Sequence, residues 1–237
     1  MENRKRQAYL VLYFDAPLQS WGFQSRFDRR TTLPFPTRSG IIGLLCAAMG
    51  IDRNDTDALR TFDRLKITVL TLREEPILID YHTVGGGYDP DTEKPFIPHT
   101  AAGKLRQGTK TTVVTYREYL QNSRFGAIVK GDRAFLNKVA SSLRDPKWGI
   151  WLGRKCCIPA DIIYQGIFDS EEEGIQKLRE HSKADILREV REVDNFTEGT
   201  DTLIDCPLDF NKREFGPRRI KVEGGKDKHQ EKGEVEE

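Results

Sequence analysis

Cysteine is scarce in this sequence, and the few cysteines are not spaced as metal ligands. The four cysteines show no CxxC spacing, and the four histidines form no metal-binding pattern with them. We therefore expect reduced, structural thiols and no metal or other cofactor. Cys46 lies in an apolar stretch, where cysteine behaves as a small hydrophobic residue.

Long hydrophobic runs are also missing. No uncharged apolar stretch approaches the ~20 residues that a membrane-spanning helix needs, and the longest covers residues 39–51. The apolar run at residues 8–14 is broken by Asp15 and Pro17, unlike the core of a signal peptide. We expect a soluble cytoplasmic protein with no membrane partner.

The sequence has no excess of either charge, but its charges are unevenly distributed. With 38 Lys and Arg against 37 Asp and Glu, the total charge does not argue for a nucleic-acid partner. Residues 100–155, however, hold twelve basic and three acidic side chains, whereas residues 169–201 hold five and eleven. The first region predicts a phosphate-binding surface, and the second does not.

The segment PFPTRSGIIGLLCAAMGI, residues 34–51, predicts a proline-framed loop that leads into a short buried helix. Prolines hold the entering backbone extended, and Thr37 or Ser39 can cap the helix by accepting a backbone N–H. The apolar residues leave the helix no polar face, which indicates burial. Gly50 stands where a helix C-terminus is expected.

The start of this helix has two interpretations. Its free N–H groups and the positive end of its dipole, beside Arg38, could bind a phosphate. Alternatively, Gly40 and Gly43 allow the helix to pack closely against a sheet, and Arg38 is solvated. The segment alone favours the second interpretation, because glycine-rich helix starts are common and phosphate sites are few.

The rest of the chain predicts strands, two further helices and an inserted arm. Hydrophobic patterns indicate strands at residues 8–14, 66–73, 77–84, 111–120 and 125–131, with further apolar segments at 148–152 and 161–168. An amphipathic helix is expected at 133–143 and an acidic surface helix at 171–181. The insert at 86–110 has no apolar period, and its glycines and prolines predict a flexible arm that projects from the sheet.

With the arm set aside, the predicted order is strand, helix, strand, strand, helix, followed by the two apolar segments, which is the order of an α+β, ferredoxin-like (RRM-like) fold. We expect an antiparallel sheet with both helices on one face. This domain would cover residues 1–168, including the arm at 86–110. A small β-rich C-terminal extension, with short strands in a second small sheet, would cover 169–223, and 224–237 would be a disordered tail.

The loop at residues 15–38 mixes aromatic and cationic side chains, among them Trp21 and Arg26. Such a mixture suits stacking on bases and pairing with phosphates. A tryptophan that covers the edge of the core explains Trp21 equally well. The same type of chemistry is expected of Lys104, Arg106 and Lys110, which lie near the end of the arm insert.

Five motifs in one order make this chain similar to the CasD (Cas-five) family of CRISPR-associated proteins, and most of all to its E subtype. They are AYLVLYFDAPLQSWG, FPTRSGIIGLLCAAMGI, DYHTVGG, TYREYL followed by RFGAIV, and WLGRKCCIPA. Together with an arm in the expected place, they cover residues 8–160. The resemblance is weak beyond about residue 170.

The resemblance implies a non-catalytic RNA-binding subunit of the type I Cascade complex, a ribonucleoprotein of antiviral defence. Members of the family hold the 5′ repeat-derived tag of the CRISPR RNA. They cap the backbone of repeated RNA-binding subunits and contact the large subunit, so that target DNA is reached only through the complex. The RRM-like domain and a thumb-like arm are part of the same implication.

The resemblance also implies where RNA would bind. Residues 36–43, with Arg38, Ser39 and Gly40, would contact the RNA backbone, and the arm would lie across the guide and displace a base. His82 would contact a nucleotide, although fixing the strand pair is about equally probable for this histidine. RNA contact is expected for two or three of four basic residues: Arg117, Arg124, Arg154 and Lys155.

Two other functions remain open. Some relatives in another subtype cleave precursor RNA without metal, and Tyr81, His82, Tyr88 and Lys104 could be imagined in such a group. Adjacent strand residues such as Tyr81 and His82 point to opposite faces, however, which disfavours a shared active site. A protein that contacts DNA directly rests only on the basic segment and ranks last.

Overall fold

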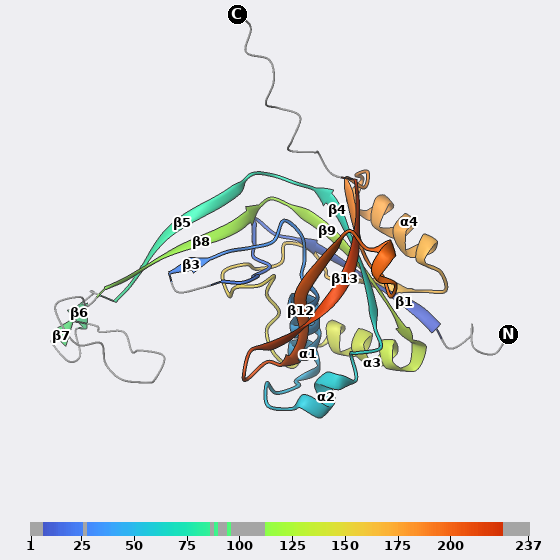
Figure 1. Cartoon of the computed structure of the whole chain (residues 1–237), viewed down its shortest axis with the longest axis horizontal. Coiled ribbons are helices and arrows are strands. Elements are labelled where there is room, and N and C mark those ends of the chain that lie inside the picture. The colour runs from blue at the N-terminus through green and yellow to red at the C-terminus, as the bar shows by residue number, and fades with distance from the viewer. Residues whose placement is uncertain (1–6, 26–27, 86–87, 90–93, 96–111, 225–237) are drawn as a thin grey trace, which may run out of the picture.

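The computed structural model describes residues 7–25, 28–85, 88–89, 94–95 and 112–224, and its body is an α+β fold built on one large antiparallel sheet (Figure 1). This sheet has seven strands in the spatial order β10-β1-β9-β4-β11-β13-β12. The strands, in chain order, are β1 (Gln7–Asp15), β4 (Lys66–Arg73), β9 (Arg124–Asp132), β10 (Tyr164–Phe168), β11 (Arg188–Glu192), β12 (Asp201–Asp209) and β13 (Glu214–Gly224).

Helices cover both faces of the sheet. The helices are α1 (Arg38–Met49), α2 (Thr56–Arg60), α3 (Arg133–Arg144) and α4 (Glu171–Ser182), with a short 3₁₀ helix η2 (Phe196–Glu198). Along the chain, with α2 and the strands of the other sheets set aside, β1, α1, β4, β9 and α3 occur in the predicted order of types, and β10 follows them. The four strands of this set lie side by side as β10-β1-β9-β4, each antiparallel to its neighbour.

Strand β1 is apolar on both sides because both of its faces are covered. Leu10 and Leu12 point into the main core, which also contains side chains of α1 and α3. Val11 and Tyr13 point the other way and pack in a second cluster with Leu178 of α4. The sequence prediction of a central strand is confirmed, and α4 is the helix that covers the second face.

Helix α1 begins and ends through the residues that the sequence predicted. The Thr37 hydroxyl accepts the backbone N–H of Gly40 at 3.1 Å, so Thr37 rather than Ser39 is the N-cap. Gly50 takes the left-handed conformation, with φ 72°, at the C-terminus of the helix.

Burial raises the pKa of Cys46 in this helix to about 12, so its thiol is neutral near physiological pH.

The C-terminal strands differ from the prediction. They do not form a second small sheet: β11 pairs with β4, β13 with β11, and β12 with β13. Without β11, the outer edge of β4 would carry unpaired backbone groups. Val190, Leu203 and Ile220 from these strands join the main core. The extension is therefore a continuation of the main sheet.

A second sheet carries the arm. Its long strands are β5 (Ile77–Val84) and β8 (Val113–Gln121), which run together away from the body, as Figure 1 shows. The opposite edge of β8 pairs with β2 (Leu18–Gln19) and, in parallel, with β3 (Arg29–Arg30). Farther out lies a short pair, β6 (Tyr88–Asp89) and β7 (Lys94–Pro95). Both predicted strands that flank the insert are confirmed.

In the part of the chain that the structure describes, no helix is long and apolar enough to cross a membrane.

All four cysteines are free. Burial also raises the pKa of Cys157 to about 11, which leaves this thiol protonated near neutral pH.

Candidate nucleic-acid interface

Three neighbouring strands bring one cation and two aromatic rings into a row at the root of the arm. Arg29 of β3 is paired with Tyr116 of β8, which is paired in turn with Tyr81 of β5. Residues paired across a sheet lie on the same face, so the three side chains are neighbours. The Arg29 guanidinium lies 5.7 Å from the centre of the Tyr116 ring, and the two tyrosine ring centres are 5.6 Å apart.

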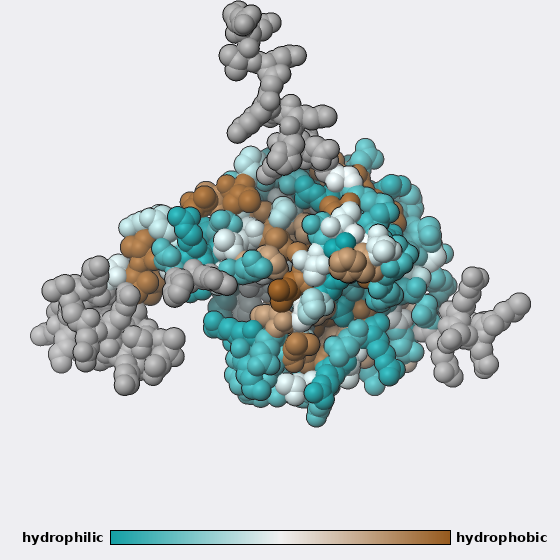
Figure 2. All heavy atoms as spheres, in the orientation of Figure 1, coloured by the Kyte–Doolittle hydropathy of each residue, from teal (hydrophilic) through white to brown (hydrophobic). Residues whose placement is uncertain are grey.

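This row is open to solvent. Tyr81 is 60% exposed and Tyr116 is 39% exposed, and Arg29 is exposed as well. The apolar side chains of Ile77 and Ile79 are also exposed along β5. Hydrophobic residues are visible along the arm in the space-filling view (Figure 2). An exposed face that combines rings and cations on a rigid sheet suits an RNA single strand.

The opposite face of the same strands is polar. Arg117 pairs with Asp80, and its Nε donates to the Thr115 hydroxyl at 3.0 Å. His82 is paired with Thr115, and its Nδ1 lies 3.5 Å from the Asp80 carboxylate. Arg117 and His82, two of the predicted RNA contacts, are therefore brought together on one face, and Tyr81 lies on the other.

Arg154 holds the root of the arm to the body. Its Nη1 donates to the Glu118 carbonyl at 2.8 Å and its Nη2 to the Arg30 carbonyl at 2.9 Å. The guanidinium also lies 4.4 Å from the centre of the Tyr119 ring. Arg154 therefore bridges β8, β3 and the loop after α3. These hydrogen bonds give Arg154 a structural role within the protein.

We expect Arg154→Met to loosen the arm strands without unfolding the body. Loss of two charge-assisted hydrogen bonds should lower the local opening free energy of β8 by about 1–3 kcal/mol. Amide hydrogen exchange across Tyr116–Leu120 would measure this change. Lys155→Met is the matched control, because Lys155 is exposed and its amine lies 5.8 Å from the Trp151 ring centre. Equal exchange in both variants would contradict the bridging role.

Lys155 and Arg124, the other two basic residues of this group, differ in how accessible their side chains are to solvent. Lys155 is exposed beside Trp151, which is itself partly exposed. Arg124, at the start of β9, is half-buried, and its Nε lies 2.9 Å from the Asp15 carboxylate. Lys155 is thus more accessible to an RNA than Arg124 or Arg154.

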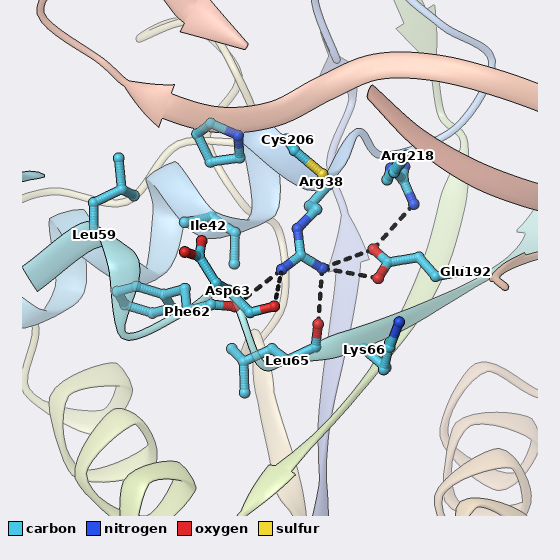
Figure 3. Close-up of a pocket in the computed structure, with 11 residues that line it drawn as sticks. Arg38, Ile42, Leu59, Phe62, Asp63, Leu65, Lys66, Glu192, Cys206 and Arg218 are labelled. Carbon is cyan, nitrogen blue, oxygen red and sulfur yellow. Dashed lines mark hydrogen bonds and ion pairs between the residues drawn. The ribbon is translucent and has the colours of Figure 1, made fainter. Parts of the chain in front are cut away.

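Arg38 is buried, which corrects the prediction that it contacts an RNA phosphate. Only 5% of the residue is exposed, and Nη1 lies 2.8 Å from the Glu192 carboxylate (Figure 3). Nη1 also donates to the Leu65 carbonyl and Nη2 to the Phe62 carbonyl, each at 2.9 Å. The side chain lies within the fold, where it joins α1 to β11 and to the segment between α2 and β4.

Arg38 belongs to a buried network of four charges. Arg218 of β13 lies 3.1 Å from Glu192 and binds Asp205 with two hydrogen bonds of 2.6 and 2.9 Å. The Asp205 carboxylate also accepts the backbone N–H of Arg38 at 2.8 Å. The start of α1 therefore already has an anion, which the C-terminal strands supply. A phosphate is not needed to explain the basic helix start.

Two other predicted contacts near α1 have structural roles. Trp21 is 1% exposed, and its ring centre lies 5.3 Å from that of Phe14 in the core, so the core-edge interpretation of this tryptophan is confirmed. A Cβ at Gly40 would lie 2.7 Å from the Trp21 ring, so glycine permits this close packing. Ser39 is half-exposed, and its hydroxyl lies 3.4 Å from that of Thr37.

Four predicted contacts lie outside the described residues: Arg26, Lys104, Arg106 and Lys110. The exposed row at the arm root is not among the contacts that the sequence predicts, since neither Arg29 nor Tyr116 is among the predicted RNA contacts. The signal that identifies the row is strand register, which aligns Arg29, Tyr116 and Tyr81. Three short sequence segments do not reveal this register by themselves.

Comparison with known proteins defines the family. The family model described as CRISPR-associated protein (Cas_Cas5) matches residues 9–221. The chain belongs to this family of CRISPR-associated proteins, which confirms the resemblance in the motifs and extends it beyond residue 170. The CRISPR system Cascade subunit CasD of Escherichia coli (strain K12) is 27% identical over 239 residues, covering 93% of this chain and 98% of that protein.

Solved structures agree with this assignment. One chain of a CRISPR RNA-guided surveillance complex is 31% identical with a TM-score of 0.71, and the match covers 90% of this chain and 88% of that chain. A crystal structure of a Cas protein is 25% identical with a TM-score of 0.63, covering 91% of this chain and 93% of that chain. The body and the arm thus form a fold that is shared with other CRISPR-associated proteins.

Proposed function

We propose that this chain is a non-catalytic, RNA-binding subunit of a type I Cascade complex of the E subtype, acting in the cytoplasm. It would hold the 5′ repeat-derived tag of the CRISPR RNA, cap the backbone of repeated subunits and contact the large subunit. Target DNA would be reached through the complex. Family membership and the likeness to a Cascade subunit and to a surveillance-complex chain support this proposal.

The observation that carries the RNA-binding part is the exposed row of Arg29, Tyr116 and Tyr81 on strands fixed to the body. Lys155 follows Arg154, which is bonded to β8 and β3, and Arg117 lies on the opposite face of β8. Cations would neutralise phosphates, while rings and sheet shape would select the unpaired tag bases. The insert at 86–110 would be the thumb that lies across the guide.

The body would supply a ferredoxin-like (RRM-like) platform for this arm. The antiparallel order β10-β1-β9-β4, with α1 and α3 packed on one face, supports this assignment. The buried network around Arg38 would then fix the C-terminal strands to the platform. In this proposal Arg38 acts through the fold rather than through the RNA, while Ser39 and Arg124 would be secondary contacts.

A metal-independent endoribonuclease is the alternative, and strand geometry disfavours it. Tyr81 and His82 lie on opposite faces of β5, since Tyr81 is paired with Tyr116 and His82 with Thr115. The His82 Nδ1 lies 3.5 Å from the Asp80 carboxylate. A general base and a phenol on opposite faces do not reach one phosphodiester.

The test of the proposed function is the affinity of the purified full chain for tag RNA, measured in EDTA against a scrambled RNA of equal length. RNA from the same mixtures is run on a gel to detect cleavage. Preferential binding of the tag that weakens as salt rises, with the RNA intact, is the expected result. His82→Ala serves as a control, because cleavage that disappears in this variant would identify an enzyme.

A further inference from the structure

We propose that Tyr81, Tyr116 and Arg29 form a stacking platform for one unpaired base of the bound RNA. This inference rests on the proposed function and deepens it by naming the residues that receive a base. The three side chains lie on one face of three adjacent strands, at one level of the sheet. They come from segments that are up to 87 positions apart in the sequence, so that only the fold brings them together.

The geometry of the rings leaves aromatic surface free. Tyr81 and Tyr116 meet at an interplanar angle of 72° with their centres 5.6 Å apart, so they do not lie flat on each other. Tyr81 is 60% exposed, although an aromatic side chain usually buries much of its area. A cross-strand pair that served only to stabilise the hairpin would not require this exposure. The free ring face offers a flat apolar surface to a base.

The charges around the row favour RNA over a protein partner. Arg29 lies over the Tyr116 ring and can pair with a phosphate beside the stacked base. Among the described residues of β3, β5 and β8, Glu118 is the one carboxylate on this face. Its Oε2 accepts the backbone N–H of Thr32 at 3.1 Å and is thereby directed to the loop. No acid on these strands therefore competes for Arg29.

The supporting structure holds the platform in place. The backbone N–H of Tyr116 donates to the Asp28 carbonyl at 2.8 Å, which fixes β8 against the segment that carries Arg29. Arg154 binds the Glu118 and Arg30 carbonyls on the same two strands. Because these bonds order the site before RNA arrives, little ordering entropy remains to oppose the stacking of a base.

The experiment uses the full chain and tag RNAs that carry the fluorescent base 2-aminopurine at one position at a time. Stacking on an aromatic ring quenches this fluorophore, and we expect quenching at one tag position on binding to the unmodified protein. The double variant Tyr81→Leu and Tyr116→Leu should lose this quenching and bind the tag about 5- to 100-fold more weakly. The double variant Tyr81→Phe and Tyr116→Phe keeps both rings and should retain quenching.

The salt dependence of binding separates stacking from charge. Removal of the rings should leave the slope of log affinity against log salt unchanged, whereas Arg29→Gln should reduce its magnitude by about 0.7. Thermal melting of each variant checks that the protein is folded. If the leucine variant is unfolded, the single change Tyr81→Leu is used, because Tyr81 is the more exposed ring.

The outcomes distinguish this inference from the proposed function. Tag binding without quenching at any position, or with equal affinity in the leucine variant, overturns the platform and leaves the tag-holding function intact. A leucine variant that binds RNA normally but no longer joins the complex identifies a protein-contact surface, and that result also overturns the platform. Failure of the unmodified protein to prefer the tag overturns both.

Discussion

Arg38→Ala should destabilise the protein by about 3–5 kcal/mol, because it removes one partner from a buried ionic network. Glu192, whose side chain is 7% exposed, would lose its 2.8 Å partner, and the Phe62 and Leu65 carbonyls would lose their donor. The free energy of unfolding, from urea titration of the purified chain, measures this effect. RNA affinity of the fraction that remains folded should change little.

Two variants control for this prediction. Arg60→Ala removes an exposed arginine whose ion pair with Asp57 lies in solvent, and it should be close to neutral. The double change Arg38→Met and Glu192→Leu replaces opposite charges with apolar groups and should recover part of the lost stability. The phosphate-contact interpretation would be restored if the Arg38→Ala variant had the same free energy of unfolding as the unchanged protein, yet bound RNA weakly and with a smaller slope of log affinity against log salt.

Gly153→Ala is expected to cost about 2–5 kcal/mol of stability, through backbone strain and a clash. Gly153 has φ 106°, a region that side chains disfavour, and an added Cβ would lie 1.8 Å from the Ser20 carbonyl oxygen. The Cβ and the carbonyl oxygen are both attached directly to the backbone, so the clash is relieved only if the backbone shifts. Since Gly153 precedes Arg154, the same change should increase amide exchange in β8.

Gly43→Ala is the matched control for this glycine. A Cβ at Gly43 would lie 3.7 Å from the Phe210 ring, which is an ordinary contact, and the position is inside α1. In a helix interior, alanine is more favourable than glycine by up to about 1 kcal/mol, so this variant should be as stable as the unchanged protein or more stable. Urea titrations that show equal losses for the two variants would contradict the special role of Gly153.

The elements that the sequence predicted are those with local signals. Strand β1 was predicted from its apolar run, α1 from the Thr37 cap and the Gly50 terminus, and the arm strands from patterns on either side of a glycine-rich insert. Each signal lies within the element or next to it. A cap or an alternation is fixed by neighbouring residues, so one sequence is sufficient to find it.

The site could be predicted only in part, because its contacts join distant segments. From the sequence, Arg38 resembles a phosphate ligand, because its actual partner Glu192 is 154 positions away along the chain. The sequence does not decide between base stacking and core packing for Trp21, because the residues that cover this side chain come from other elements. The C-terminal strands had no local feature that tied them to β4, and they were therefore assigned to a sheet of their own.

The exposed row at the arm root has no local signal in the sequence. Tyr116 lies in a strand that leaves the body, and only the pairing of this strand with β5 and β3 places Arg29 and Tyr81 beside it. Arg154 is one of four basic residues of which two or three are expected to contact RNA, and two of its N–H groups donate to backbone carbonyls. Charge density predicts where a phosphate-binding surface lies, but hydrogen bonding decides which cations are free to use it.

The measurement that tests the central claim most directly is tag binding by the full chain in EDTA, followed from low to high salt. The account predicts a clear preference for the repeat-derived tag over scrambled RNA, a linear fall of log affinity with log salt, and RNA that stays intact on the gel. Equal affinity for both RNAs, or specific cleavage of repeat RNA without metal, would contradict it.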